Sequence, residues 1–301
     1  MTPKADDHSS PAATPFVRGD TLHDCPPTLD DQGVIDFCRD GFVIFPGVVP
    51  DEINSKAIDY VDNIDSNLTP PDLAHTDWFV DGVLKNPQAA GAVRALLGRD
   101  FALPVRIHNH RGPLPASNQG GWHRDGGALY THRVEYLQVF YYPEACTDEM
   151  GPTEVLPGSH FVRTKHNMMS HYGKIAGTVS TACVAGTIFL TAFSIWHRRT
   201  RATSGPTGKS KFRNLLKYTY WRTTAPKRDW IIDPAFDFAG IDFSPTGDRA
   251  LFEQSQGAIA AGKMFAWLSG VQEQYIKRGG PSWPLGPVGM PPALENPTDP
   301  S

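Results

Sequence analysis

The sequence predicts a mainly β protein built on a jelly roll, with helices added before and after it. Residues 101–222 consist of short runs rich in Val, Ile, Phe and Tyr that Gly and Pro separate, a pattern typical of many short strands joined by turns. On both sides of this segment apolar residues recur at helical spacing. The chain shows no internal repeat, and its 301 residues are enough for a domain with a large core.

The segment before the sheet begins with a predicted short helix and a strand. Thr28 and Asp31 fit a capping box, and an apolar stripe follows at Val34, Ile35, Phe37 and Cys38. Residues 41–47 (GFVIFPG) then predict a buried strand between chain breakers.

Two more helices are predicted before residue 101. One lies between Pro50 and Ile64, where acidic residues occupy the first turn. The other opens at Asn86-Pro87, runs to Leu97 and stops at Gly98.

The rest of the chain supplies one further helix and two extended ends. The helix lies between Asp248 and Leu268, although Gly257 and Gly262 lower its propensity. Residues 1–27 are rich in Pro, Ser, Thr and Asp and predict a flexible segment, or one that orders by lying on the domain. We therefore expect a single domain over residues 28–278, followed by a Pro/Gly-rich tail at 279–301.

Charge and cysteine content exclude several classes of protein. A net charge of −4 gives no electrostatic footprint for binding nucleic acid. The four cysteines are scattered without paired spacing, which indicates neither a disulfide framework nor a zinc site. No run of about 18 apolar residues and no apolar N-terminal segment is present, so we expect a cytoplasmic protein without a membrane span.

Candidate metal ligands lie in the stretch Gly120–Gly127 and far downstream. On an extended strand His123 and Asp125 would share one face, presenting an imidazole beside a carboxylate. His197, on a later strand, would complete the two-histidine, one-carboxylate face that holds Fe(II) and leaves positions open for chemistry. The His-x-Asp triplet alone is a weak signal, and the alternative is a set of unrelated polar residues in a solvated loop.

Further motifs follow the triplet in a fixed order. After Trp122-His123-Arg124-Asp125 come residues 151–160 (GPTEVLPGSH), residues 185–190 (AGTIFL), the pair Trp196-His197, and Arg213 on the next strand. This ordered set, spanning about residues 30–222, resembles the phytanoyl-CoA dioxygenase-like group of Fe(II)/2-oxoglutarate-dependent oxygenases. The resemblance implies a double-stranded β-helix, Fe(II) held by His123, Asp125 and His197, and the co-substrates 2-oxoglutarate and O2.

Other polar residues are candidates for holding 2-oxoglutarate. Arg213 is the predicted partner of its distal carboxylate, because a guanidinium can make two parallel hydrogen bonds to that group. The alternative is a surface arginine. Gln138 and Thr187, on strands that flank the site, would hydrogen-bond the co-substrate or serve as core polar residues. His160, in the Pro-Gly-Ser-His turn, is predicted to be structural and not a ligand.

Candidate substrate residues are His108, on the strand before the triplet, and Tyr130 and Trp221 as pocket aromatics. Arg198 begins a basic run that includes Arg199, Arg201, Lys209, Lys211 and Arg213. This run would recruit an anionic substrate to the mouth of the site, or form a solvated face.

The resemblance implies an oxygenase that hydroxylates a C–H bond of a small molecule and releases succinate and CO2. Desaturation, epoxidation or ring formation would use the same residues. Asp125 fills the position where halogenating relatives have a small residue, so halogenation is not expected. Two alternatives stay open, namely a non-enzymatic jelly-roll binding protein and a cupin-type metalloenzyme that needs no 2-oxo acid. The sequence names neither the substrate nor the oligomeric state.

Overall fold

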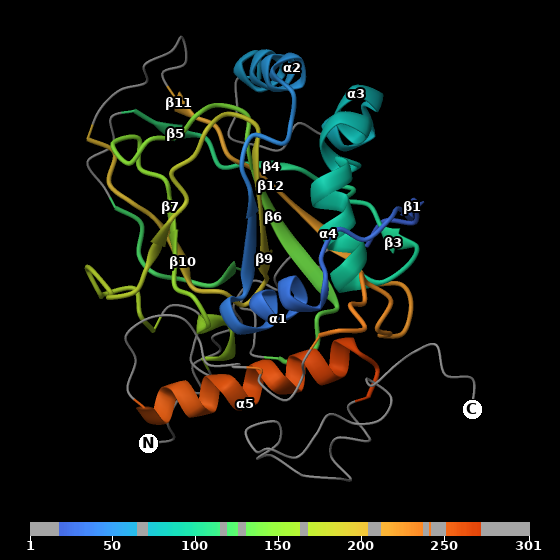
Figure 1. Cartoon of the computed structure of the whole chain (residues 1–301). Helices are drawn as coiled ribbons and strands as arrows, with labels where there is room; N and C mark the ends of the chain where they lie inside the picture. The colour runs from blue at the N-terminus through green and yellow to red at the C-terminus, as the bar shows by residue number, and fades with distance from the viewer. Residues whose placement is uncertain are drawn as a thin grey trace, which may run out of the picture.

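A computed structural model describes residues 18–64, 72–114, 119–125, 131–162, 168–203, 212–236, 241 and 251–271. Within them a large antiparallel sheet has helices on one face and a smaller set of strands on the other (Figure 1). This is the mainly β jelly roll with flanking helices that the sequence predicts.

The helical elements are α1 (Asp31–Asp40), α2 (Asp51–Asp62), η1 (Leu73–His75), α3 (Asp77–Phe79), η2 (Val80–Leu84), α4 (Pro87–Leu97), η4 (Ser159–Phe161) and α5 (Leu251–Leu268). The strands before the metal triplet are β1 (Leu22–His23), β2 (Phe42–Phe45), β3 (Phe101–Ala102), β4 (His108–Asn109) and β5 (Gly112–Pro113). The later strands are β6 (Tyr136–Tyr142), β7 (Thr153–Val155), β8 (Val179–Ser180), β9 (Thr187–Ala192), β10 (His197–Arg199), β11 (Phe212–Arg213) and β12 (Leu216–Trp221).

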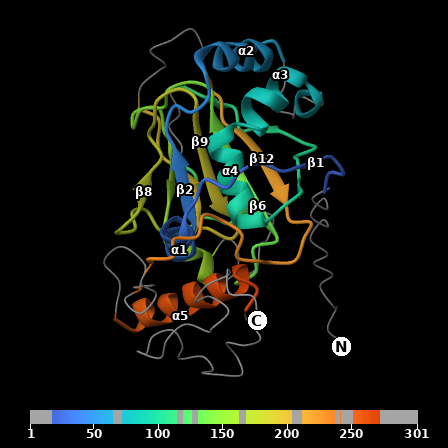
Figure 2. The same ribbon diagram turned by 45° about the vertical axis from the view of Figure 1, so that its right-hand side comes forward.

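The large sheet has the order β1-β3-β12-β6-β9-β2, with β4 also paired to β12. The smaller strands form two groups, β10-β7-β8 and β11-β5. Figure 2 shows α1 and α5 together at one end of the large sheet and α2 at the other. Strands far apart in the sequence therefore meet between the two layers.

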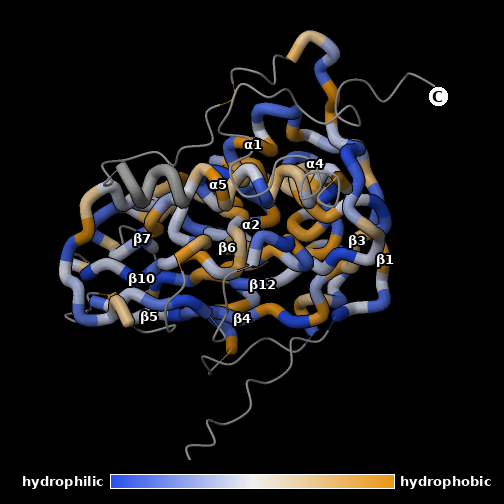
Figure 3. Tube along the Cα trace, turned by 90° about the horizontal axis from the view of Figure 1, so that it is seen from below, coloured by the Kyte–Doolittle hydropathy of each residue, from blue (hydrophilic) through white to orange (hydrophobic). Residues whose placement is uncertain are grey.

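Both faces of the large sheet are buried, and alternation along β6 separates them. Leu137, Val139 and Tyr141 point into the larger apolar cluster that includes the helices. Phe140 and Tyr142 point the other way, into a second cluster between the two layers. Figure 3 shows hydrophilic residues around β4, β5 and β10, in contrast to the apolar residues of the helical layer.

The predicted helices are present, with one correction at a cap. The side chain of Asp30, not Thr28, caps α1 by accepting a hydrogen bond from the backbone N–H of Gly33 at 2.8 Å. Thr28 instead donates its hydroxyl to the carbonyl of Gln88 at 2.9 Å. The carboxylate stands directly before the first helical residue, the position from which a side chain reaches the free N–H groups.

The helix α5 forms despite its two glycines, since it packs against α1 and buries Ala258, Ala261 and Phe265. Packing here outweighs the low helix propensity of glycine.

Part of the N-terminal segment lies on the domain. Leu22 and His23 pair with Ala102 and Phe101 as an edge strand, which is the second of the two predicted behaviours. Residues 1–17 and the predicted tail at 279–301 lie outside the described residues.

A buried carboxylate joins α1 to the segment after β12. Asp31 is fully buried and accepts hydrogen bonds from Arg228, from the indole N–H of Trp230 and from the backbone N–H of Asp233. The described helices include none that is long and apolar enough to cross a membrane.

Candidate metal centre

The two histidines of the predicted triad lie opposite each other. His123 and His197 form an isolated antiparallel bridge in which each backbone N–H donates to the other's carbonyl at 3.0 Å. Their ring centroids are 4.5 Å apart. Because directly opposed residues of an antiparallel pair project from the same face, the bridge alone brings the two imidazoles together.

Asp125 completes the group. Its Oδ1 lies 3.6 Å from Nε2 of His123, and its Oδ2 lies 3.5 Å from Nε2 of His197. One ligand atom from each residue lies within 4.8 Å of the others. The expected strand does not extend to Asp125, because regular pairing ends at the His123 bridge. The carboxylate reaches the histidines from the turn that follows.

The tautomers of both histidines favour metal binding. Nδ1 of His123 lies 2.8 Å from the carbonyl of Gly121, and Nδ1 of His197 lies 3.1 Å from the carbonyl of Ile195. A carbonyl only accepts, so each Nδ1 carries the proton and each Nε2 keeps a lone pair directed at Asp125.

One of these nitrogens has no partner in the protein. Nε2 of His197 is buried and makes no hydrogen bond to another described residue. Burial lowers the pKa of His197 to about 3, so the imidazole is neutral and able to ligate near pH 7. Ligands about 2.1 Å from one metal are roughly 3 Å apart, close to the distances seen here. The donor set therefore fits Fe(II), and a ligand on Nε2 would satisfy this buried atom.

Two side chains hold the carboxylate. Gln138 donates to Oδ2 of Asp125 at 2.5 Å, and the ammonium of Lys217 makes an ion pair with the same oxygen. Burial alone would raise the pKa of Asp125, but the charge of Lys217, the partial charge of His197 and the two hydrogen bonds hold it well below its usual value. Asp125 is therefore ionised. Gln138 was predicted either to contact the co-substrate or to be a core polar residue with a local partner, and in the structure its partner is Asp125.

Sequence reasoning did not single out Lys217. A signal was available, because Arg213, Leu215 and Lys217 alternate along the last strands and residues two apart share a face. Burial lowers the pKa of Lys217, and Asp125 opposes that effect.

Arg213 is buried between the large sheet and the smaller strands. It is buried on β11, which pairs with β5, and it donates to the carbonyl of Gly151. Burial raises the pKa values of Tyr142 and Cys146, and the positive charge of Arg213 opposes both shifts, so its guanidinium lies near them. A cation is thus present between the layers, and its role as partner of the 2-oxoglutarate carboxylate stays a prediction.

Two of the remaining candidates already have protein partners. The hydroxyl of Thr187 donates to the carbonyl of Val184 at 2.8 Å and accepts from Gly47 at 3.2 Å, so it serves a turn. Arg198 follows His197 and points to the opposite face of β10, where it pairs with Glu154 at 2.7 Å. The structure therefore does not bring Arg198 to the metal ligands.

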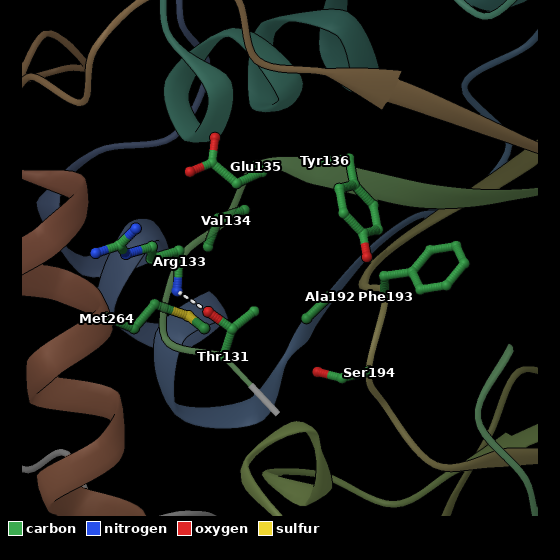
Figure 4. A pocket seen from close by; sticks show the side chains of 9 residues that line it. All are labelled: Thr131, Arg133, Val134, Glu135, Tyr136, Ala192, Phe193, Ser194 and Met264. Carbon is green, nitrogen blue, oxygen red and sulfur yellow. Dashed lines mark hydrogen bonds between the residues drawn. The ribbon is translucent and has the colours of Figure 1, made fainter. Parts of the chain in front are cut away.

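Of the aromatic candidates, Trp221 stacks against Tyr136 with ring centroids 4.7 Å apart. Tyr130 lies outside the described residues. Tyr136 also packs on Phe193 at 4.9 Å, and these two rings line a cavity of about 50 Å³ whose far side is Met264 of α5 (Figure 4). Tyr136 and Gln138 share a face of β6, so one ring of this cavity lies on the same face of the sheet as the side chain that holds Asp125.

The Pro-Gly-Ser-His turn contacts the backbone next to His197. The hydroxyl of Ser159 accepts from the backbone N–H of Trp196 at 2.9 Å, which fixes the residue before the ligand. Nε2 of His160 lies 3.1 Å from the carbonyl of Cys38, so His160 is structural, as predicted. Gly41, with φ of +86°, leaves room for its ring, because a Cβ there would lie 2.4 Å from Nδ1 of His160.

Comparisons with known proteins agree with this geometry. Residues 80–207 match the family model described as phytanoyl-CoA dioxygenase (PhyH). No curated protein matches the chain. The fold is similar to that of HygX from Streptomyces hygroscopicus with iron bound, with a TM-score of 0.52, 17% identity, and coverage of 66% of this chain and 89% of HygX.

A second similar structure is the epimerase SnoN in complex with Fe3+, alpha ketoglutarate and nogalamycin RO. It has a TM-score of 0.50, 14% identity, and coverage of 72% of this chain and 93% of SnoN. At such low identity both likenesses show the fold, and the family match covers the segment that carries His123, Asp125 and His197. Residues 80–207 thus resemble the phytanoyl-CoA dioxygenase family over the segment that carries the three candidate ligands, and this match together with the donor set supports a non-haem iron oxygenase that uses Fe(II), 2-oxoglutarate and O2.

Proposed function

We propose that the protein hydroxylates a C–H bond of a small organic molecule, with His123, Asp125 and His197 holding the iron. The observation that carries this proposal is the convergence of three ligand atoms on one point, with the buried Nε2 of His197 left for a metal. Three protein ligands on one face leave the other positions for 2-oxoglutarate and O2. When bound, this group supplies the oxidation that exchanges C–H for C–OH while 2-oxoglutarate becomes succinate and CO2.

The chain's own residues supply orientation. Gln138 and Lys217 fix the carboxylate of Asp125, and two backbone carbonyls fix the imidazoles, so the ligands are held in place before the metal arrives. Arg213 would hold the distal carboxylate of 2-oxoglutarate by paired hydrogen bonds. The apolar side chains between the two layers exclude water from the reacting atoms.

A small-molecule substrate is supported by the similar folds. HygX has been crystallised with nickel, 2-oxoglutarate and hygromycin B bound, at a TM-score of 0.50 and 17% identity to this chain. SnoN holds nogalamycin RO together with Fe3+ and alpha ketoglutarate. Desaturation, epoxidation or ring formation would proceed from the same residues, and product analysis separates them from hydroxylation.

The test begins without oxygen. Fe(II) and 2-oxoglutarate added together should produce a weak visible charge-transfer band in the wild-type protein and not in His197→Ala. Oxygen is then admitted with a library of lipids, CoA esters, amino acids and natural-product scaffolds, and succinate release identifies substrates. Mass spectrometry should find one added oxygen atom in the product. A wild-type protein that gives no band would refute the proposal.

A further inference from the structure

The ammonium of Lys217 lies at the metal centre with no role in ligation. It contacts Oδ2 of Asp125 and lies 4.7 Å above the ring of Phe140 on the inner face of β6. The side chain is 7% exposed. A charge buried to this degree is costly unless an opposite charge accompanies it.

Two histidines share the face of Lys217. His108 is directly opposite Lys217 in the pairing of β4 with β12, so both side chains project to the same side. His110 follows two residues later on that side, and its backbone N–H donates to Leu215. Burial lowers the pKa values of both histidines, and the charge of Lys217 lowers them further. Both are therefore neutral near pH 7 and able to donate through a ring N–H.

Both imidazoles also keep exposed side-chain surface. Lys217, His108 and His110 therefore form a polar cluster beside Asp125, in which the ammonium is buried and the two histidines reach solvent.

Among Asp125, Arg213, Lys217, the metal and the co-substrate, the loaded site would hold one more positive than negative charge. Asp125 and the two carboxylates of 2-oxoglutarate together offset Fe(II) and Arg213. The ammonium of Lys217 then has no counter-charge of its own, because Asp125 is also a metal ligand. In the described part of the chain, the ion pair recorded for Lys217 is the one with Asp125. A bound anion would remove this imbalance.

We propose that Lys217, with His108 and His110, binds an acidic group of the primary substrate, so the substrate is a small organic acid. This inference rests on the proposed oxygenase function and adds the substrate class. The proposed binding site differs from the basic run that begins at Arg198, because the guanidinium of Arg198 already forms an ion pair with Glu154.

The side chains on the same inner face of the sheet indicate the length and polarity of the rest of the acid. Trp221 lies four positions after Lys217 on β12, which is roughly 13 Å at the rise of a strand. It stacks against Tyr136, its partner on β6. Gln138, which holds Asp125, pairs with Thr219 between them. An acid with an apolar or aromatic body would reach from Lys217 toward these rings and present its middle to the metal.

Matched acid and amide probes test this proposal. Phenylacetate with phenylacetamide, 3-phenylpropionate with its amide, and indole-3-acetate with its amide are titrated into anaerobic protein loaded with Fe(II) and 2-oxoglutarate. Binding is measured by calorimetry and by perturbation of the charge-transfer band. The variants are Lys217→Met, which keeps length without charge, and Lys217→Arg, which keeps the charge. Lys85→Met, which alters a surface lysine paired with Asp81, is the matched control.

In wild type and in Lys85→Met, at least one acid should bind about 10- to 100-fold more tightly than its amide. Lys217→Met should abolish that preference, Lys217→Arg should retain part of it, and the loss of 2-oxoglutarate affinity in either variant should be smaller than its loss of acid affinity. The preference should appear only after metal loading, because Asp125 neutralises Lys217 in the metal-free protein.

Two results overturn the proposal while leaving the oxygenase function intact. The first is a normal band with no acid preferred over its amide. The second is a loss of 2-oxoglutarate affinity in Lys217→Met equal to the loss for the acid, which assigns the ammonium to the co-substrate's own carboxylate. Absence of the band in wild type would instead refute the oxygenase function, and this inference with it.

Discussion

His123 and His197 exchange both backbone hydrogen bonds, so the two imidazoles are held beside each other by the main chain. Segments far apart in the sequence are thereby joined by main-chain hydrogen bonds into one ligand platform. Asp125 reaches this platform from the turn that follows, and Gln138 and Lys217 keep it there. The platform exists before a metal binds, which makes its properties testable in the metal-free protein.

Fe(II) should stabilise the wild-type protein, since a ligand that binds only the folded state adds about 2.7 kcal/mol at 100 times its Kd. His197→Ala should lose that gain and all succinate release, because it removes the buried ligand nitrogen. Thermal unfolding with and without Fe(II), under nitrogen, measures the effect. His171→Ala, at an exposed position, is the control and should behave like wild type.

Asp125→Asn should destabilise the metal-free protein by about 3 kcal/mol, because it leaves the ammonium of Lys217 buried without a counter-charge. Adding Lys217→Met should recover most of the loss. Urea denaturation of the two single variants and the double variant gives the coupling energy. Additive effects would show that the ion pair contributes nothing to folding.

Arg213→Ala should raise the Kd for 2-oxoglutarate by about 10- to 100-fold, because it removes a bidentate, charge-assisted contact. Metal affinity should stay unchanged. Calorimetry with Ni(II)-loaded protein measures both quantities without turnover. Arg99→Ala changes an exposed arginine and serves as the control. Equal affinities in Arg213→Ala and wild type would exclude Arg213 as the carboxylate partner.

Asp31→Ala should lower the free energy of unfolding by about 3 to 5 kcal/mol, because Arg228 and the Trp230 indole would lose their buried acceptor. Asp36→Ala, on the exposed side of the same helix, should cost less than 1 kcal/mol. Urea denaturation compares the two. Metal binding by the folded fraction should be the same in both, since neither residue is near the triad.

Acid should destabilise the metal-free protein through His197. Its folded pKa is about 3, below the ordinary 6.5, so between these values the unfolded chain binds a proton that the folded chain does not. Stability is fully present above pH 6.5 and falls toward pH 3, by up to about 1.4 kcal/mol per pH unit. His197→Gln should have a shallower slope in urea denaturation with chelator present. A steeper or unchanged slope would contradict the assignment.

The sequence predicts the architecture well where a local pattern coincides with burial. The helix from Pro87 to Leu97 has its proline at the first position and its glycine at the cap, and the structure has those bounds. The capping residue of α1 was predicted at Thr28 but lies at Asp30, since two neighbouring side chains both suit the role and only the path of the chain decides between them.

The metal ligands could be located from motif order, whereas the pairing that places one neighbour against another could not. Lys217 and His108 are adjacent only through the pairing of β12 with β4, and no sequence spacing encodes that register. Thr187 and Arg198 illustrate the reverse case. Each lies on a strand next to the site, yet their hydrogen bonds to Val184 and Glu154 direct them elsewhere.

The central place of β12 has a practical consequence for anyone preparing a shortened protein. Residues 80–207 contain all three candidate iron ligands, but they omit the strand that lies between β3 and β6 and the edge strand β2. In a fragment cut to the matched segment, β6 would lose its partner β12 and β9 would lose its partner β2. The two strands would stay paired with each other, but each would present one unpaired edge, and such edges promote aggregation. Expression trials should therefore retain the chain from β1 through α5.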